Sequence, residues 1–320
     1  MGQVLRSAKS VVEEAIHVSI QTDPLKRLAQ QMVCTKTEVP SWPEVYHFKR
    51  GEEETLFYLI VLDSLNFCFW PAQGKEKWKV RCGDQWLGGY YALSYSLKRA
   101  FETGRLAPDA KSLAGMSLER LKDILQGRGE LQLLGARLEI LHELSHVLLK
   151  NFKGKACNLV SAASNSSPNL VDILAQNLLS FRDVAEYAGK KVFFYKRAQI
   201  LAADLYGAFE GRTWGYFKDM DQLTAFADYK LPQALRHVGV LAYEPGLAEK
   251  VDNEVVLEAG SAEEVEIRAS TIWGVELIRR ELAAMGKDLN AYEIDWFLWN
   301  MGQKPEFKKK PHHRTVTIFY

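Results

Sequence analysis

The chain has 320 residues, of which 47% are hydrophobic and 25% charged, and its formal net charge is +1. This composition is typical of a globular protein and excludes a disordered or fibrous chain. The near-zero charge argues against a long polyanion as the main ligand, because nucleic-acid-binding domains usually carry a basic stripe. Four dispersed cysteines without a CxxC pair favour neither a disulfide framework nor a thiolate metal site.

The N-terminal sequence "MGQVLRSAKSVVEEAIHVSI" carries charges throughout and has no apolar run of signal-peptide length. No stretch reaches the roughly 18 apolar residues that a membrane span needs. We therefore expect a cytoplasmic protein that makes no contact with a membrane.

Most of the chain shows helical periodicity, and turn residues separate the helical stretches. The sequence predicts a mainly α fold, a single helical domain over residues 1–320 with residues 1–40 as an N-terminal helical extension packed on it. Strands should be few and short, at 190–194 ("KKVFF") and 315–320 ("TVTIFY"). The clearest predicted helices lie at 118–125, 131–152, 169–180, 195–210, 261–285 and 290–302.

The stretch "LFYLIVLDSLNFCFWP" at 56–71 combines an acid with aromatic residues. If it is helical throughout, Asp63, Asn66, Phe67 and Trp70 share one face. A buried acid needs partners. Asp63 therefore either bonds neighbouring backbone while the rings pack, or faces a ligand, and the pattern supports both interpretations.

The stretch "HELSH" at 142–146 matches HExxH, in which two histidines one helical turn apart bind zinc and the glutamate acts as a base. The extended motif would need Gly and His where the chain has Leu149 and Phe152. The polar residues of this segment also fit the solvated face of an amphipathic helix. We therefore expect no metal site here.

Two cations, Lys196 and Arg197, open the helix predicted at 195–210. Positive charge near a helix start is unfavourable unless an anion lies there. A bound phosphate would satisfy both cations. A surface ion pair with Asp204 or Glu210 is the alternative, and the sequence does not decide between them.

The stretch "TAFADYKLPQALRHVG" at 224–239 holds one carboxylate, Asp228, between two aromatic residues. Pro232 suits a helix start, so we expect Asp228 in the connector between a helix near 220–227 and another from 232. It would then either cap the second helix or act as a partly desolvated acid. An acid of the second kind stabilises a reaction that develops positive charge, such as glycosidic bond cleavage.

The predicted helix at 290–302 has two distinct faces. One is apolar, and the other can line a cavity for a flat heterocycle, with aromatic rings for stacking and a carboxylate for the donor edge of the base. The apolar face contains Ile294, Phe297, Leu298 and Met301, and the second face contains Tyr292, Asp295, Trp296, Trp299 and Asn300.

Several long stretches together resemble the queuosine salvage proteins, a family of queuosine 5′-monophosphate N-glycosidases. They are "LDSLNFCFWP", "GYYALSYSLKRAFE", "FFYKRAQILAADLY", "FADYKLPQAL", "EVEIRASTIWGVELIR" and the "DWFLW" helix. The resemblance implies hydrolysis of queuosine 5′-monophosphate to queuine and ribose 5-phosphate, so that queuine can be inserted into tRNA. It also implies an all-helical fold similar to the helix–hairpin–helix DNA glycosylases, and no metal or other cofactor.

The same resemblance implies roles for residues at matching positions. The Asp of "FADY", Asp228, is the catalytic acid, and Asp295 and Trp296 of "DWFLW" contact the base. Asn300 stands where the family often has a second acid, and its amide can bond the cyclopentenediol hydroxyls of the queuine side chain. Whether Asp228 is a nucleophile, an electrostatic stabiliser or a water-positioning group stays open.

Four further residues complete the predicted substrate site. His47 in "EVYHFKRG" belongs to the pocket, and Lys196 of "YKRAQ" meets the 5′-phosphate. Phe226 stacks on the base, and Ala227 beside it is also expected at the substrate. The roles of Asp63 and Arg197 are left unassigned.

Two other functions fit parts of the same pattern. A DNA base-excision glycosylase of similar fold is disfavoured by the near-neutral charge, and a non-catalytic queuine or nucleotide carrier would not need Asp228. We expect a monomer that binds a small molecule and makes no direct contact with nucleic acid.

Overall fold

The computed structural model describes residues 2–35 and 43–320, and within these ranges it contains fourteen α-helices, four 3₁₀-helices and six short strands. The expectation of a mainly α fold with a few short strands is therefore confirmed. The α-helices are α1 (Gly2–Glu14), α2 (Thr22–Val33), α3 (Glu52–Ser64), α4 (Tyr90–Glu102), α5 (Ala110–Ala114), α6 (Leu118–Ile124), α7 (Leu134–Asn151), α8 (Ala156–Ser161), α9 (Ser167–Asn177), α10 (Lys196–Ala208), α11 (Lys230–His237), α12 (Pro245–Asp252), α13 (Ala262–Ala284) and α14 (Ala291–Gly302). The 3₁₀-helices are η1 (Leu179–Phe181), η2 (Thr213–Gly215), η3 (Met220–Gln222) and η4 (Pro305–Lys308).

The strands form three antiparallel pairs in the described residues, β1 with β6, β2 with β3, and β4 with β5. Their bounds are β1 (Val18–Ile20), β2 (Lys79–Cys82), β3 (Gln85–Gly88), β4 (Val184–Tyr187), β5 (Lys190–Phe193) and β6 (Leu241–Tyr243). The β1–β6 pair joins the N-terminal segment to the C-terminal half, with Ser19 opposite Ala242. The N-terminal residues are thus tied into the fold by main-chain hydrogen bonds as well as by packing.

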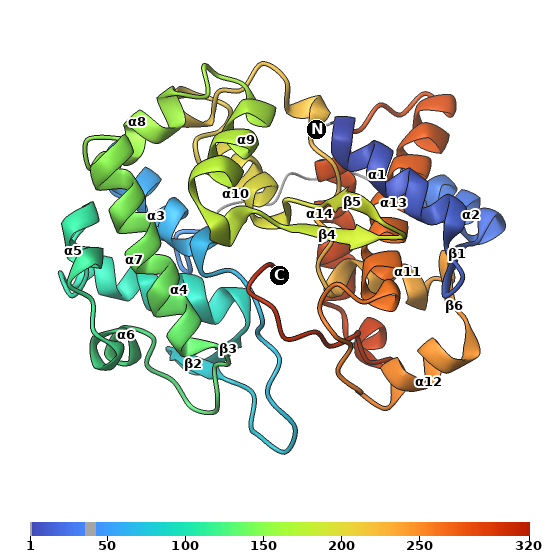
Figure 1. The fold of residues 1–320 in the computed structure, drawn as a ribbon, viewed down its shortest axis with the longest axis horizontal. Helices are drawn as coiled ribbons and strands as arrows, with labels where there is room; N and C mark the ends of the chain where they lie inside the picture. The colour runs from blue at the N-terminus through green and yellow to red at the C-terminus, as the bar shows by residue number, and fades with distance from the viewer. Residues whose placement is uncertain (1, 36–42) are drawn as a thin grey trace.

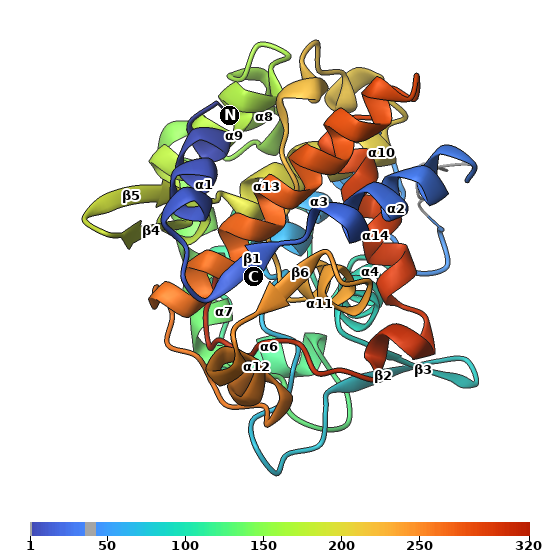
Figure 2. The same cartoon turned by 90° about the vertical axis from the view of Figure 1, so that its right-hand side faces the viewer.

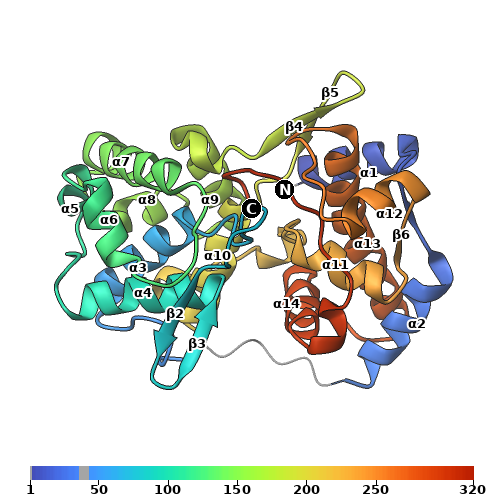
Figure 3. The ribbon, with the colours of Figure 1, turned by 90° about the horizontal axis from the view of Figure 1, so that it is seen from below.

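The helices gather into two groups with α10 between them. Helices α3 to α8 lie on one side, and α1, α2 and α11 to α14 lie on the other (Figures 1 and 3). The long helix α13 runs diagonally through the second group, where it packs against α1, α2, α11 and α14 (Figure 2). Two hydrophobic clusters form the core: the larger is centred on α3, α7, α9 and α10, and the smaller joins α2, α11, α13 and α14.

Local sequence signals explain several helix starts. Ser261 accepts the N–H of Glu264 at the start of α13, and Asn290 and Glu293 form a capping box at the start of α14. Such caps satisfy backbone donors that have no partner inside the helix. No helix in the described ranges combines the length and the apolar character needed to span a membrane.

Two local expectations were wrong, and a third, conditional one does not apply. Helix α3 ends at Ser64, so residues 56–71 are not helical throughout, and two buried guanidinium groups bind the carbonyls that follow. Arg197 binds the Asp63 and Ser64 carbonyls, and Arg137 binds those of Leu65, Phe67 and Cys68. The helical face that was to carry Asp63, Asn66, Phe67 and Trp70 therefore does not exist.

The other two corrections concern residues 220–227 and the C-terminus. Only the short η3 forms near 220, and the chain from 223 to 228 has no regular structure, so the predicted pair of helices around Asp228 is replaced by a loop leading into α11. The stretch 315–320 is not a strand; the C-terminal residue instead accepts the N–H of Cys68 through its carbonyl. In both places tertiary contacts satisfy the backbone without a helix or a ladder.

Candidate active site

One pocket lies between the two groups of helices and is lined by residues from both. Its empty volume is about 860 Å³, including the part that opens to solvent. Seven of the eight predicted site residues line it: His47, Lys196, Phe226, Asp228, Asp295, Trp296 and Asn300. Ala227 does not line it, because its carbonyl points to the Nε of Arg268, 3.0 Å away. The two of these residues that are furthest apart in the sequence, His47 and Asn300, are separated by 253 positions.

Asp228 caps the start of α11 and also lines the pocket, so the two alternatives that the sequence left open do not exclude each other. Its Oδ1 accepts the backbone N–H groups of Lys230 at 2.7 Å and Leu231 at 2.8 Å, at the start of α11. Its Oδ2 makes no hydrogen bond with any residue that the structure describes, and the side chain lines the pocket. One oxygen therefore fixes the carboxyl group on the helix start, and the other remains available to a substrate.

Lys196 is the cation that acts most strongly on Asp228. Its side chain is only 4% exposed, and its Nζ donates a long hydrogen bond, 3.4 Å, to the Asn66 carbonyl. Burial lowers the pKa of Lys196, while the charges of Asp228, Asp63 and Asp295 raise it. Conversely, burial raises the pKa of Asp228, and Lys196 and the α11 N–H groups counteract this effect. The mutual attraction favours an ionised Asp228 beside a protonated Lys196.

Asp295 lies deeper, on α14, and its carboxyl group orients the loop before Asp228. Its Oδ2 accepts the backbone N–H of Phe226 at 2.7 Å. Burial raises the pKa of Asp295 well above its ordinary value, and the nearby charge of Asp228 raises it further. Two acids whose surroundings differ in this way can hold different protonation states at the same pH.

The second face of α14 lines the pocket as predicted, through Trp296, Trp299 and Asn300. Ile294 and Leu298 on the opposite face are fully buried in the smaller hydrophobic cluster. Tyr292 departs from the expectation, because it is buried against Tyr206 and Trp296 and does not line the pocket.

A second aromatic wall comes from the start of α4. Tyr90 and Tyr91 line the pocket, and each makes an edge contact with the Trp299 ring, at centroid distances of 6.4 and 5.9 Å. His47 lies beside Tyr90, with ring centroids 5.7 Å apart. Burial lowers the pKa of His47 to about 3, so its imidazole is neutral at physiological pH. The pocket thus offers several ring faces for a planar base.

An ion pair outside the pocket, between Arg268 and Asp183, holds the backbone next to Asp228 and at Lys196. Arg268 donates to both carboxylate oxygens of Asp183, at 3.0 and 2.6 Å. The same Arg268 binds the Ala227 carbonyl, directly before Asp228, and Asp183 accepts the backbone N–H of Lys196 at 3.2 Å. Sequence reasoning missed this pair because its members are 85 residues apart.

Two further acids lie behind Lys196. Asp63 is fully buried, and its carboxyl group lies close to that of Asp204, which lines the pocket. Burial raises the pKa of Asp63 to about 7 and that of Asp204 well above its ordinary value. Two carboxyl groups in contact cannot both ionise readily, so the pair shares a proton. The surface ion pair considered for Lys196 and Arg197 is absent from the described residues, since both cations are buried.

Several pocket residues had only weak signals in the sequence. Trp299 was visible as part of the helix face, and Asn66 as part of an acid–amide–aromatic stretch. Tyr90, Tyr91 and Asp204 carried no pattern that separates them from core residues. Arg197, whose role the sequence left unassigned, binds main-chain carbonyls and stacks on Phe67 and Phe181, which is a structural role.

The "HELSH" residues have ordinary partners in α7. The Nε2 of His142 lies 2.9 Å from the Met116 carbonyl, and Glu143 accepts the backbone N–H groups of Leu179 and Ser180. The glutamate therefore caps η1 rather than standing beside a metal position.

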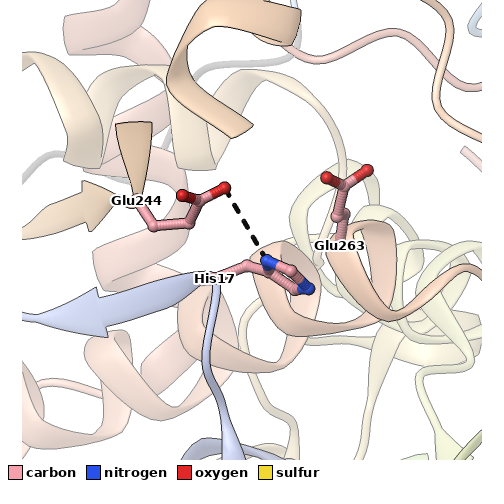
Figure 4. A group of neighbouring side chains, drawn as sticks. All are labelled: His17, Glu244 and Glu263. Atoms are coloured by element: carbon pink, nitrogen blue, oxygen red, sulfur yellow. Dashed lines mark ion pairs between the residues drawn. The ribbon is translucent and has the colours of Figure 1, made fainter. Parts of the chain in front are cut away.

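A different group of possible metal ligands consists of His17, Glu244 and Glu263 (Figure 4), none of which lines the pocket. The Nδ1 of His17 is 3.8 Å from Glu244, whose carboxylate caps α12 through the N–H groups of Gly246 and Leu247. Glu263 is paired with Lys250 at 2.7 Å. Local partners already account for both carboxylates, so nothing in this group requires a metal.

Comparison with known proteins identifies the relatives of the chain. The family model described as "Queuosine salvage protein" matches residues 46–320. A protein of Sphaerobacter thermophilus named queuosine 5′-phosphate N-glycosylase/hydrolase is 45% identical, over 99% of this chain and 97% of its own length. Proteins of the same name from Dictyostelium discoideum and Mus musculus are 40% and 35% identical, over 84% and 98% of this chain and 79% and 97% of their own lengths.

Proposed function

The chain belongs to the queuosine salvage protein family, and from this premise we propose that it hydrolyses the N-glycosidic bond of queuosine 5′-phosphate. Water adds to C1′ of the ribose, the bond from C1′ to the base breaks, and queuine and ribose 5-phosphate leave. The observation that carries the proposal is Asp228. It has one oxygen held by two backbone N–H groups and a second directed to no protein partner, beside the buried Lys196, in an aromatic pocket.

The substrate explains why such an acid is needed. Queuine is a 7-deazaguanine and lacks the ring N7 that purine glycosidases can protonate, so catalysis depends more on stabilising the sugar cation. The ionised Asp228 stabilises positive charge that develops at C1′, in a site where water is largely excluded. A single positioned group of this kind contributes a factor of about 10²–10⁴. Lys196 keeps Asp228 ionised and holds its carboxylate in place.

Asp295, Phe226, Trp296 and Asn300 bind the base. Asp295 accepts from the ring N1–H and the exocyclic amine of queuine, which favours its ionised form once the base is bound. Trp296 and Phe226 stack on the ring. Asn300 is exposed at the rim of the pocket, where its amide can reach the hydroxyl groups of the cyclopentenediol. His47 contacts the substrate as a neutral imidazole.

The chain's own charge favours a free nucleotide over a polynucleotide. Its net charge of +1 gives no overall excess of positive charge, which binding to a nucleic-acid backbone usually needs. We therefore propose a cytoplasmic monomer that acts on the free mononucleotide and needs no cofactor. A carrier of queuine would use the same rings, but the placement of Asp228 and Lys196 would serve no purpose in it.

The test is release of queuine from queuosine 5′-phosphate, followed by mass spectrometry, for the wild type and Asp228→Asn. The amide oxygen of the variant can still accept the two α11 N–H groups, so the fold should be retained. We expect release by the wild type and a loss of about 10²–10⁴-fold in the variant. Asp109→Asn, which alters an aspartate that caps α5 outside the pocket, should keep full activity.

The outcomes separate the rival functions. Equal release by the wild type and Asp228→Asn would place catalysis on another residue. Tight queuine binding without release by the wild type would make the chain a carrier. Binding of duplex DNA that weakens steeply with salt would favour a DNA glycosylase.

A further inference from the structure

Tyr320 connects the two groups of helices but does not line the pocket between them. The C-terminus lies between the two groups (Figures 1 and 3). The Tyr320 carbonyl accepts the N–H of Cys68, in the segment after α3, and the Tyr320 hydroxyl donates to Glu264 of α13 at 2.8 Å. The side chain of Tyr320 is buried. This residue therefore contacts both halves of the fold that enclose the site.

Glu264 links Tyr320 to the ion pair that holds the backbone of the site. Its Oε1 accepts the Tyr320 hydroxyl and lies 3.4 Å from the Nη1 of Arg268, and its Oε2 accepts the Gly260 N–H at 3.1 Å. Burial raises the pKa of Glu264, and Arg268 and the Tyr320 hydroxyl counteract this effect. These two partners favour the ionised form of Glu264. A second carboxylate therefore lies beside the guanidinium group that Asp183 binds.

His313 holds the Tyr320 hydroxyl group from another direction. The Nε2 of His313 lies 3.3 Å from the hydroxyl oxygen, and both side chains are buried. Burial lowers the pKa of His313 to about 3, so its imidazole is neutral at physiological pH. The Tyr320 hydroxyl donates its one proton to Glu264, and the imidazole with its proton on Nε2 then donates to the hydroxyl oxygen. One donor and one acceptor thus fix the orientation of the hydroxyl group.

Two carboxylates compete for the N–H groups of Arg268. Asp183 accepts two hydrogen bonds from the guanidinium group, at 3.0 and 2.6 Å, whereas Glu264 stays at the longer distance of an ion pair. Without the Tyr320 hydroxyl, the buried Oε1 of Glu264 would take its hydrogen bond from Arg268, because a buried charge needs a partner. The guanidinium group would then turn away from Asp183 and from the Ala227 carbonyl, to which its Nε donates at 3.0 Å. The hydroxyl group therefore keeps Arg268 in the orientation that supports the site.

We propose that Tyr320 is a positioning residue for catalysis and that it acts through Glu264 and Arg268. This inference rests on the proposed function, because it takes Asp228 as the group that stabilises the sugar cation. Arg268 binds the carbonyl directly before Asp228, and its carboxylate partner accepts the N–H of Lys196. When the guanidinium group turns, both charged groups of the site shift relative to the substrate. A misplacement of about 1 Å can lower the rate about 100-fold.

The test compares Tyr320→Phe with Tyr187→Phe. Tyr187 donates to Glu266 at 2.8 Å, also on α13, but Glu266 binds backbone N–H groups at the start of β1. Each variant keeps its ring and loses one hydrogen bond to a carboxylate of α13, which should lower Tm by at most about 4 °C. Such a bond changes an equilibrium by about 10- to 100-fold. We expect kcat for queuine release to fall by about this factor in Tyr320→Phe, with a smaller change in KM, and to stay at the wild-type value in Tyr187→Phe.

A second substitution distinguishes positioning from a loss of packing. In the double variant Tyr320→Phe with Glu264→Gln, the amide oxygen can still accept the Gly260 N–H, but no negative charge competes for Arg268. We expect this double variant to recover most of the kcat that Tyr320→Phe loses. An equal kcat in Tyr320→Phe and Tyr187→Phe would overturn the inference, and so would the absence of any recovery in the double variant.

Amide hydrogen exchange tests the same positioning without the reaction. The N–H of Lys196 donates to Asp183 at 3.2 Å, so its exchange rate, measured by NMR, reports whether Asp183 keeps its place. We expect faster exchange at Lys196 in Tyr320→Phe and the wild-type rate in Tyr187→Phe. If the wild type releases no queuine, the proposed function fails, and this comparison still tests the positioning by itself. Equal exchange rates at Lys196 in the two variants would refute it.

Discussion

Replacing Arg268 by Lys tests whether the Arg268–Asp183 ion pair positions the site. Arg268 is buried and makes three hydrogen bonds, two to Asp183 and one to the Ala227 carbonyl. A lysine keeps the charge but can replace only one of the three. The variant therefore loses two hydrogen bonds in which the donor is charged, each worth about 1.5–3 kcal/mol, or about 3–6 kcal/mol together.

This loss can be converted into a melting temperature. Unfolding entropy is about 2.1 cal/mol/K per residue, which for 320 residues makes about 0.7 kcal/mol/K. We therefore expect Arg268→Lys to lower Tm by about 4–9 °C, measured by circular dichroism. At a temperature where the variant is still folded, kcat should fall by up to about 100-fold, because the backbones before Asp228 and at Lys196 lose their support.

Arg280→Lys is the matched control on the same helix. Arg280 pairs with Glu276, but its side chain is 55% exposed, and exposed pairs contribute less than about 1 kcal/mol. We expect a shift in Tm of about 1 °C and unchanged kcat. The reasoning is refuted if the two variants shift Tm equally. A destabilised Arg268→Lys with normal kcat would leave the ion pair as a stabilising contact only.

Two further predictions follow from the buried acids. Burial raises the pKa of Asp228, and catalysis needs its ionised form, so kcat/KM should fall as the pH drops below this raised pKa. A pH–rate profile in which kcat/KM rises towards acid pH would contradict the role of Asp228. Asp63, with its pKa raised to about 7, binds more protons in the folded than in the unfolded state between pH 4 and 7, so folding stability falls as the pH rises through this range. Asp63→Asn keeps a partner for Asp204 and removes this loss, so urea denaturation should show the variant gaining stability relative to wild type between pH 5 and pH 8, by at most about 3 kcal/mol. An equal difference at both pH values would show that Asp63 does not titrate in this range.

Much of the secondary structure could be predicted from local patterns. The helices at 131–152, 195–210, 261–285 and 290–302 occur within a few residues of their predicted bounds. Their periodicity is strong, and polar caps such as Ser261 and Asn290 mark their starts. Short strands such as β1 and β6 were missed because three residues carry too little pattern, and they form only where distant segments meet.

The stretch at 56–71 shows what local patterns leave open. Its apolar residues continue past Ser64, so the sequence alone does not say where the helix ends. The actual end is set by Arg137 and Arg197, which take the carbonyls that a continuing helix would use. These two residues come from α7 and α10, and no local pattern in the sequence shows that they contact this segment.

The sequence by itself determined the helical class, the pocket-lining face of α14 and, through long ordered motifs, the family and seven of the residues that line the pocket. These features depend on local spacing or on the identity of contiguous stretches. The tertiary structure alone decided the electrostatics: which cation lies beside Asp228, and which acids share a proton. Charge interactions depend on the distance between the groups and on their burial. For residues far apart in the chain, only the folded structure sets these two quantities.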